Sequence, residues 1–269
     1  MLSISSISMN SLLFQVIIPF ALSAVIIILI TIIAERYGTK TGGILGTLPS
    51  TIIVAFIFIS LNKGVYFASQ SAVVVPAEMG VNLVFLFIFA VLSYRSIYIA
   101  ITTSLLVWVL LTSLLFVLNL ENIFISIMIY VIALVFTFML LERVKKIQSV
   151  GSVSIHYTPM KIVFRGLLAG TVIAIAVFLS NIGAVLSGIF SVFPAIFLST
   201  MLISLREHGP NFAGGIAKSM IFGSQSVMIY AVAIYFFYPL YGVVSGSIFA
   251  FGISIIVMMI LLGLRKKIN

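Results

Sequence analysis

Long apolar runs follow one another along the whole chain, and short polar segments separate them. Most runs are about 20 residues long, which is the length at which an α-helix crosses the hydrocarbon core of a bilayer. They lack the ten-residue alternation of apolar and polar positions that is typical of transmembrane β-strands. The pattern therefore predicts an all-α polytopic membrane protein of about nine transmembrane helices, at residues 11–34, 43–61, 67–93, 97–118, 122–141, 162–183, 185–204, 213–237 and 240–263.

The composition changes this picture little, because 63% of the 269 residues are hydrophobic and only 7% are charged. Soluble domains carry about 25% charged residues, so this chain has too few charges to cover a surface that faces water. The net charge of +9 does not indicate nucleic-acid binding, since the basic residues gather at one side of the predicted bundle. We expect a multi-pass protein of the cell membrane, with the lipid bilayer as a partner and no nucleic-acid partner.

The distribution of lysine and arginine predicts the topology. With the N-terminus outside and the C-terminus in the cytoplasm, every basic residue except Lys63 falls in an inner loop or at the inner end of a helix, which is 13 of 14. This bias is the one that the positive-inside rule describes. The long connection at residues 142–161 then lies in the cytoplasm. The apolar run that follows Met1–Asn10 is expected to be a retained span, because it is too long for a signal peptide.

The chain also repeats itself at an offset of 145 residues. Glycine and proline recur at equivalent positions of the two halves: Gly43 and Gly188, Pro49 and Pro194, Gly64 and Gly209. The offset maps the second span onto the seventh, and a shift by an odd number of spans inverts the second copy in the membrane. This predicts a first four-helix repeat at 1–120, a connecting helix and cytoplasmic loop at 121–160, and a second, inverted four-helix repeat at 161–269. Such repeats recur in secondary transporters, although a duplication kept only for a stable symmetric bundle would leave the same pattern.

The second half carries the motif Gly-x-x-x-x-Phe-Pro at Gly188–Pro194, followed by Gly209 and two further helices. In these features it resembles the GlpM-like small membrane proteins, which are short four-helix chains with a similar motif. The resemblance covers residues 165–265, and it reaches 20–115 only through the repeat, where Leu48 replaces the aromatic residue before Pro49. The chain departs from that family in carrying two copies joined by an extra helix. The resemblance implies the fold more than an activity.

Glu78 is the only acidic residue inside a predicted span. It lies about 16 Å along the third helix, near the middle of the bilayer, where a charged side chain costs at least about 2.5 kcal/mol. Burial favours the neutral carboxylic acid, so Glu78 is a candidate carrier of a proton or a cation. The alternative interpretation is a protonated carboxyl group that holds two helices together by a hydrogen bond. Pro76, two residues earlier, is expected to kink this helix.

Other polar residues accompany Glu78. Gln70 and Asn82 lie eight residues before it and four residues after it, near one face of a helix. In the eighth span, Lys218 and Gln225 are seven residues apart, again on one face. If the two polar faces meet, they enclose a cavity for a small molecule or an ion; alternatively, these side chains only bridge helices. A direct ion pair between Glu78 and Lys218 is not favoured, because Lys218 starts nearer the inner surface and its long side chain can extend toward it.

Helix interruptions form a second set of candidate positions. Pro49 and Pro194 lie about five residues into equivalent spans, and Gly43, Gly188 and Pro76 mark the other expected breaks. Broken helices expose backbone groups that can bind ions or anionic groups. Proline in a first turn can equally do no more than start a half-helix.

Catalysis is not expected. The chain has no cysteine and no aspartate, and its two histidines, His156 and His208, lie in predicted loops. A Ser/His/Asp triad and a metal cluster therefore cannot be assembled in their usual forms, and we predict no enzyme activity, no metal and no cofactor. The expected function is secondary transport of a small cation or organic solute, coupled to protons through Glu78. The alternative is a non-transporting accessory or scaffold protein for a membrane enzyme or complex, and a homodimer or a membrane partner fits either function.

Overall fold

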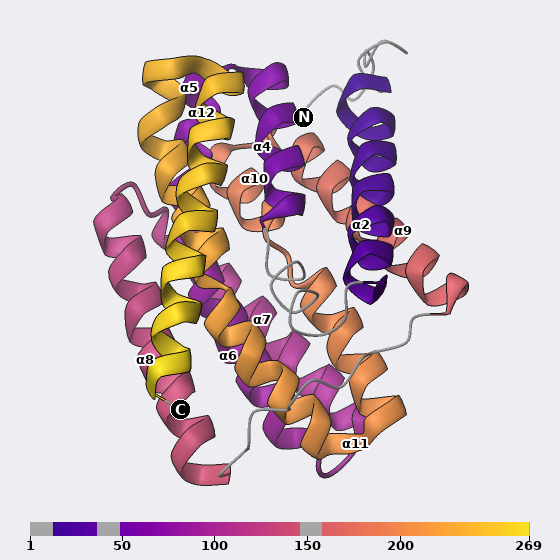
Figure 1. Ribbon diagram of the computed structural model, residues 1–269. Helices are drawn as coiled ribbons and strands as arrows, with labels where there is room; N and C mark the ends of the chain where they lie inside the picture. The colour runs from indigo at the N-terminus through magenta and orange to yellow at the C-terminus, as the bar shows by residue number, and fades with distance from the viewer. Residues whose placement is uncertain (1–12, 37–48, 146–157, 269) are drawn as a thin grey trace.

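The computed structural model describes residues 13–36, 49–145 and 158–268, and every regular element within them is a helix. The helices pack lengthwise into a bundle (Figure 1). In chain order they are the π-helix η1 (Leu13–Ile17) and the α-helices α2 (Ile18–Arg36), α4 (Ser50–Lys63), α5 (Val65–Ala72), α6 (Val75–Leu92), α7 (Ile97–Leu118), α8 (Ile123–Lys145), α9 (Pro159–Leu179), α10 (Ala184–Ser191), α11 (Ala195–Gly223) and α12 (Gln225–Ile268).

Within the described residues, six helical segments are long and apolar enough to cross a membrane. The prediction of an all-α, multi-pass membrane protein is therefore confirmed. Gly43 and the start of the second predicted span lie outside the described residues, and so does His156.

Three glycines reverse the direction of the chain between helical segments. Gly64, Gly209 and Gly242 have φ values of 91°, 80° and 73°, with ψ near the extended range. Residues with a Cβ rarely adopt this conformation, so glycine is the residue that allows these turns. Gly209 divides α11 into the segments 195–208 and 210–223, and Gly242 divides α12 into 225–241 and 243–268. Figure 1 shows α12 rising to the upper end of the bundle and returning.

Side-chain contacts confirm the reversal in α12. The hydroxyl groups of Tyr238 and Ser247 lie 2.8 Å apart, and Ser254 Oγ donates to the Ser226 carbonyl oxygen over 2.6 Å. Each pair joins one residue before Gly242 to one after it. The two segments of α12 are therefore antiparallel neighbours.

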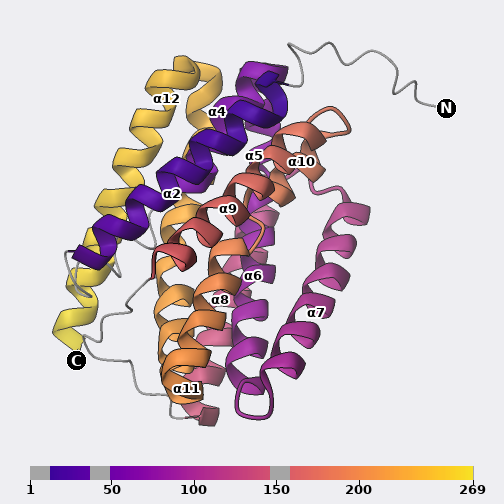
Figure 2. The same cartoon turned by 90° about the vertical axis from the view of Figure 1, so that its right-hand side faces the viewer.

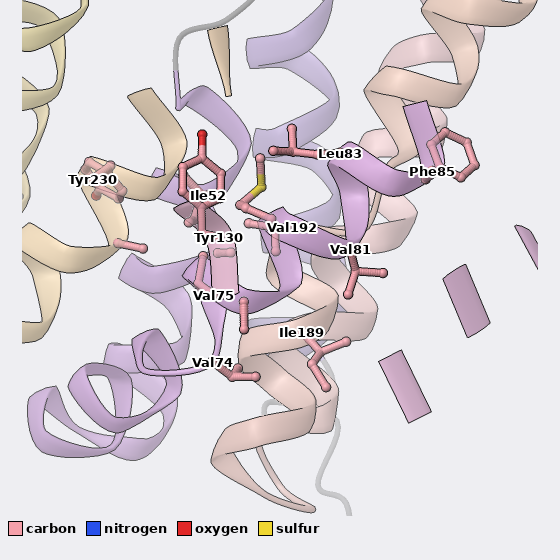
Figure 3. Packing of buried hydrophobic residues seen from close by; sticks show 14 of the residues in the cluster. Ile52, Val74, Val75, Val81, Leu83, Phe85, Tyr130, Ile189, Val192 and Tyr230 are labelled. Carbon is pink, nitrogen blue, oxygen red and sulfur yellow. The ribbon is translucent and has the colours of Figure 1, made fainter. Parts of the chain in front are cut away.

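Helices also break in the interior of the bundle, without reversing. The third predicted span is divided into α5 and α6 at Val73–Val74, and the seventh is divided into α10 and α11 between Val192 and Pro194. Pro76 lies in the first turn of α6, where its missing N–H leaves no hydrogen bond unmade. The interruption expected at Pro76 therefore lies just before it, at Val73 and Val74, which both keep right-handed helical angles. Figure 3 shows apolar residues from both breaks packed together, among them Val74, Val75, Ile189 and Val192.

Two pairs of equivalent residues have nearly the same backbone conformation. Pro49 precedes α4 with φ −75° and ψ 43°, and Pro194 precedes α11 with φ −75° and ψ 36°. Fifteen residues later in each half come the reversals at Gly64 and Gly209. The backbone angles therefore match at these proline positions, and φ is positive at both glycines.

The helices α2 and α9 lie against each other through small residues (Figure 2). A Cβ atom on Gly170 would lie 2.6 Å from the carbonyl oxygen of Phe20, and one on Gly166 would lie 2.9 Å from that of Ala24. Backbone oxygens cannot yield to such an approach, so glycine sets the distance between the two helices.

The core is centred on α6. In α6, 72% of the residues are buried, whereas 22% are buried in the apolar helix α7. The remaining faces of α7, α8 and α12 expose large apolar side chains, as lipid-facing helices do. The mostly buried helix α6 also carries two completely buried polar residues, Glu78 and Asn82.

Candidate functional site

Glu78 lies in the first turn of α6 and is completely buried. Thr112 on α7 donates its hydroxyl proton to the carboxyl group, with Oγ1 at 2.9 Å from Oε1 and 3.1 Å from Oε2. Burial favours the neutral carboxylic acid, whereas the N-terminal end of α6 favours the carboxylate. Two opposing influences of this kind suit a carboxyl group that exchanges a proton during a working cycle.

Asn82, one turn further along α6, connects two other elements. Its Nδ2 donates to the carbonyl oxygen of Val192 over 2.7 Å, and its Oδ1 accepts from Trp108 Nε1 over 3.0 Å. Val192 lies in the break between α10 and α11, so its carbonyl oxygen has no partner within a continuous helix. Trp108 also packs edge-on against Phe193, with ring centroids 4.8 Å apart. Asn82 therefore ties the broken helix to both α6 and α7.

A cavity of about 60 Å³ lies beside this network. A water molecule needs about 10–15 Å³ measured in this way, so the cavity has room for several water molecules or a small solute. Three helix boundaries contribute to its wall: the start of α4, the break between α10 and α11, and the break between α11 and α12. The lining residues are Thr51, Met79, Ala169, Val172, Ile173, Ser191, Val192, Phe193, Pro194, Ala195, Ile196, Phe197, Gly223, Ser224 and Val227.

Two half-helices begin at this cavity. Pro49 precedes α4 and Pro194 precedes α11, and neither start has a hydrogen bond from a capping side chain. The amides of a first turn have no partner within their own helix. Thr51 and Ile196, in these two first turns, line the cavity. The interior wall thus offers backbone donors as well as the hydroxyl group of Thr51.

Lys218 lies apart from Glu78. It is buried, and its Nζ lies 5.4 Å from the centre of the Phe138 ring on α8. Within the described part of the chain, no ion pair joins it to Glu78, and the ion pair found there joins Lys161 to Glu207. The Lys218 side chain thus packs against Phe138 on α8, and its extension to the inner surface stays a prediction.

The remaining predicted residues are placed separately. Gln70 lies on α5, before the interruption at Val73–Val74, and its side chain is exposed, whereas Glu78 is buried. Gln225 is the first residue of α12, and its Nε2 donates to the Phe222 carbonyl oxygen over 3.0 Å, across the break at Ser224. Gln225 therefore adjoins the cavity, whereas Gln70 does not reach the network.

The sequence analysis missed two members of the site, Trp108 and Thr112. They are four residues apart on α7, which places both on the face that meets α6. A threonine inside a membrane helix usually bonds to its own backbone, as Thr137 does to the Ala133 carbonyl oxygen over 2.6 Å. The one available signal was the single tryptophan of the chain, which lies one turn from a polar residue.

Gly188 is important for packing. A methyl group on it would overlap the carbonyl oxygen of Ser71, so α10 lies directly on the end of α5. Among the described residues, no group of three histidine, cysteine, aspartate or glutamate side chains could hold a metal ion.

A comparison of this chain with protein-family models, curated proteins and solved structures finds no match. The similarity of the second half to the GlpM-like proteins remains a resemblance carried by the motif at Gly188–Pro194.

Proposed function

We propose that this protein is a secondary transporter of a small cation or organic solute, with Glu78 as the carrier of the coupling proton. One observation carries the proposal: a buried carboxyl group and Asn82 join α6 and α7 to an interrupted helix that lines an interior cavity. Interior ionisable residues and broken helices around a central site are the features that transporters combine.

The hydrogen-bond network links the protonation state of Glu78 to the broken helix formed by α10 and α11. A carboxylate accepts hydrogen bonds only, whereas the protonated group can also donate one. Loss of the proton therefore changes which hydrogen bonds Glu78 can make with Thr112, its partner on α7. Trp108 on the same helix holds Asn82, and Asn82 holds the Val192 carbonyl oxygen. A shift of α7 against α6 would thus alter the wall of the cavity.

The architecture that we propose is nine transmembrane helices in two inverted four-helix repeats joined by a central helix. The matching backbone angles at Pro49 and Pro194 support it. The packing also supports it, because α5 contacts α12 and α6 contacts α11. A twofold axis between the two halves would relate these two contacts to each other. The last of the long apolar segments, residues 184–260, contains the reversals at Gly209 and Gly242 and accounts for three crossings.

The proposed topology places the N-terminus outside and the C-terminus in the cytoplasm. Arg95, Lys145 and Arg206 lie where α6, α8 and the segment 195–208 of α11 end, toward one end of the bundle (Figure 2), and Lys63 ends α4 at the other. We expect a cysteine introduced at Ser154, in the segment outside the described residues, to resist an impermeant thiol reagent in intact cells and to react after the cells are opened. The native chain has no cysteine, so the unmodified protein is the control. Rapid reaction in intact cells would show that the chain has the opposite orientation in the membrane.

Transport itself is tested with the purified protein in liposomes that carry a pH gradient. We expect the wild-type protein to dissipate the gradient only when a transported solute is present, and candidate cations and small organic solutes are added one at a time to find it. The accessory function makes the opposite prediction, namely a stoichiometric membrane partner on purification and no flux with any solute. That outcome would replace the transporter proposal.

A further inference from the structure

At one end of the bundle, amide and hydroxyl side chains from three helices form a continuous hydrogen-bonded cluster. Gln15 Nε2 donates to Asn62 Oδ1 over 2.9 Å, Asn62 Nδ2 donates to Ser180 Oγ over 2.8 Å, and Asn181 Nδ2 donates to Gln15 Oε1 over 2.8 Å. We call these four residues the amide clamp. Gln15 precedes α2 in the π-helix η1, Asn62 is near the end of α4, and the other two follow α9. The clamp therefore fixes the far end of α4 to the pair α2 and α9.

The opposite end of the bundle has an ion pair in the corresponding place. Lys161 in the first turn of α9 pairs with Glu207 near the end of the segment 195–208 of α11. We call this pair the ionic clamp. Glu207 is 145 residues after Asn62, which is the offset of the sequence repeat, and Lys161 lies one residue beyond the position that the same offset assigns to Gln15. In Figures 1 and 2, α4 ends at the upper end of the bundle, while α11 reverses at the lower end.

Each clamp holds the outer end of a half-helix whose inner end lines the cavity. The helix α4 runs from Thr51 in the cavity wall to Asn62, and the first segment of α11 runs from Ala195 in the cavity wall to Glu207. Both helical segments begin just after a proline, at Pro49 and Pro194, and a glycine reversal follows each clamp, at Gly64 and Gly209. A half-helix bounded in this way can tilt as a unit once its clamp opens.

We propose that the two clamps are the gates of the transporter, so that opening the amide clamp exposes the cavity to one side of the membrane and opening the ionic clamp exposes it to the other. This inference rests on the proposed function. In the structure the hydrogen bonds of the amide clamp and the ion pair of the ionic clamp are both formed. Alternation between two gates is what moves a solute without leaving an open pore.

The two gates differ in their chemistry. The amide clamp contains no charge, whereas the ionic clamp is a salt bridge with side-chain exposures of 32% and 27% for Lys161 and Glu207. Salt screens partly exposed ion pairs and has little effect on neutral hydrogen bonds. Raising the ionic strength is therefore expected to favour opening at the ionic clamp alone.

The experiment measures access to the cavity from each side. A single cysteine at Thr51, in the cavity wall, is labelled with an impermeant thiol reagent in right-side-out and in inside-out vesicles. We expect Asn62→Ala to raise the labelling rate about tenfold from the side of the amide clamp only. Glu207→Gln is expected to raise it several-fold from the other side only. Lys63→Ala and Arg206→Ala, which remove exposed charges next to each clamp, are the matched controls and should leave both rates unchanged.

Charge reversal and transport complete the test. The double variant Lys161→Glu with Glu207→Lys should return the labelling rate to the wild-type value, which a loss of folding would not do. If the labelling rate is unchanged in both clamp variants, or rises equally from both sides, the clamps are not gates, whether or not the protein transports. Side-specific rises in a protein that carries no flux would support the gates and reject the proposed transport, so the two failures are distinguishable.

Discussion

Replacing Glu78 with glutamine is expected to reduce proton-coupled flux to the level of empty liposomes while the protein stays folded. Glutamine has nearly the same shape and can bond to Thr112, which donates to Glu78 over 2.9 Å. It cannot take up or release a proton, so the coupling step is lost while the helix contact remains. The measurement is the decay of an imposed pH gradient in the presence of the transported solute, with thermal unfolding followed in parallel.

Lys218 is the control for this prediction, because it is the other buried charged residue that the sequence analysis placed opposite Glu78. Its Nζ lies over the Phe138 ring, so we expect Lys218→Ala to leave proton coupling nearly intact. A charge swap, Glu78→Lys with Lys218→Glu, should not restore flux. Restoration by the swap would establish an ion pair in the working cycle and contradict this assignment.

A Glu78→Gln protein that transports and dissipates the gradient as the wild type does would remove Glu78 from the coupling step. The interaction with Thr112 would then be a structural hydrogen bond between α6 and α7. Thr112→Val separates the two roles further, since it removes the hydrogen bond but keeps the carboxyl group. In a transporter it should alter the pH dependence of flux, whereas in a purely structural contact it should lower only the unfolding temperature.

The sequence predicts the helical, multi-pass class because apolar runs of membrane length have few other outcomes. It does not reveal where such a run breaks. Val73 and Val74, which separate α5 from α6, are as apolar as the helices on either side, and nothing in their side chains marks a break. Pro76 gives the nearest signal, but a proline in a first turn lies after the break and not in it. Gly64 and Gly209 were visible as repeated glycines between predicted spans, so the reversals were expected there, and the structure adds that both glycines have positive φ.

The candidate site, too, could be predicted from the sequence only in part. Glu78 stands out in the sequence because a lone acid in an apolar run requires an explanation. Gln70 was placed with it by extending one helical period through residues 70–82, but the structure divides this stretch into α5 and α6 and exposes Gln70 while it buries Glu78. Thr112 could not be predicted, since a threonine in a membrane helix ordinarily bonds to its own backbone. Which residues meet across two helices depends on how the helices pack, and the periodicity of a single helix does not reveal that packing.

The second large effect is expected at Gly188, where the repeat, the family-like motif and the packing of α10 coincide. A Cβ atom there would overlap the Ser71 carbonyl oxygen and lie 2.7 Å from Val74 Cγ1. The carbonyl oxygen belongs to the backbone at the end of α5 and cannot rotate away, so Gly188→Ser must push α10 off the break between α5 and α6. Overpacking of this kind costs about 1–3 kcal/mol. We expect the unfolding midpoint in detergent to fall by several degrees.

Function should fall with stability, because α10 leads directly into Val192, whose carbonyl oxygen accepts the hydrogen bond from Asn82. The matched control is Gly183→Ser, the same change five residues earlier. Gly183 has an extended φ of 174°, and a Cβ atom built on it meets no atom within 4 Å. Serine is also favoured at its position just before a helix, so this variant should unfold at or slightly above the wild-type temperature and transport normally. Equal unfolding temperatures for the two variants would show that α10 does not lie on the Ser71 carbonyl group in the membrane, and the path from Glu78 through Asn82 to the cavity would lose its structural support.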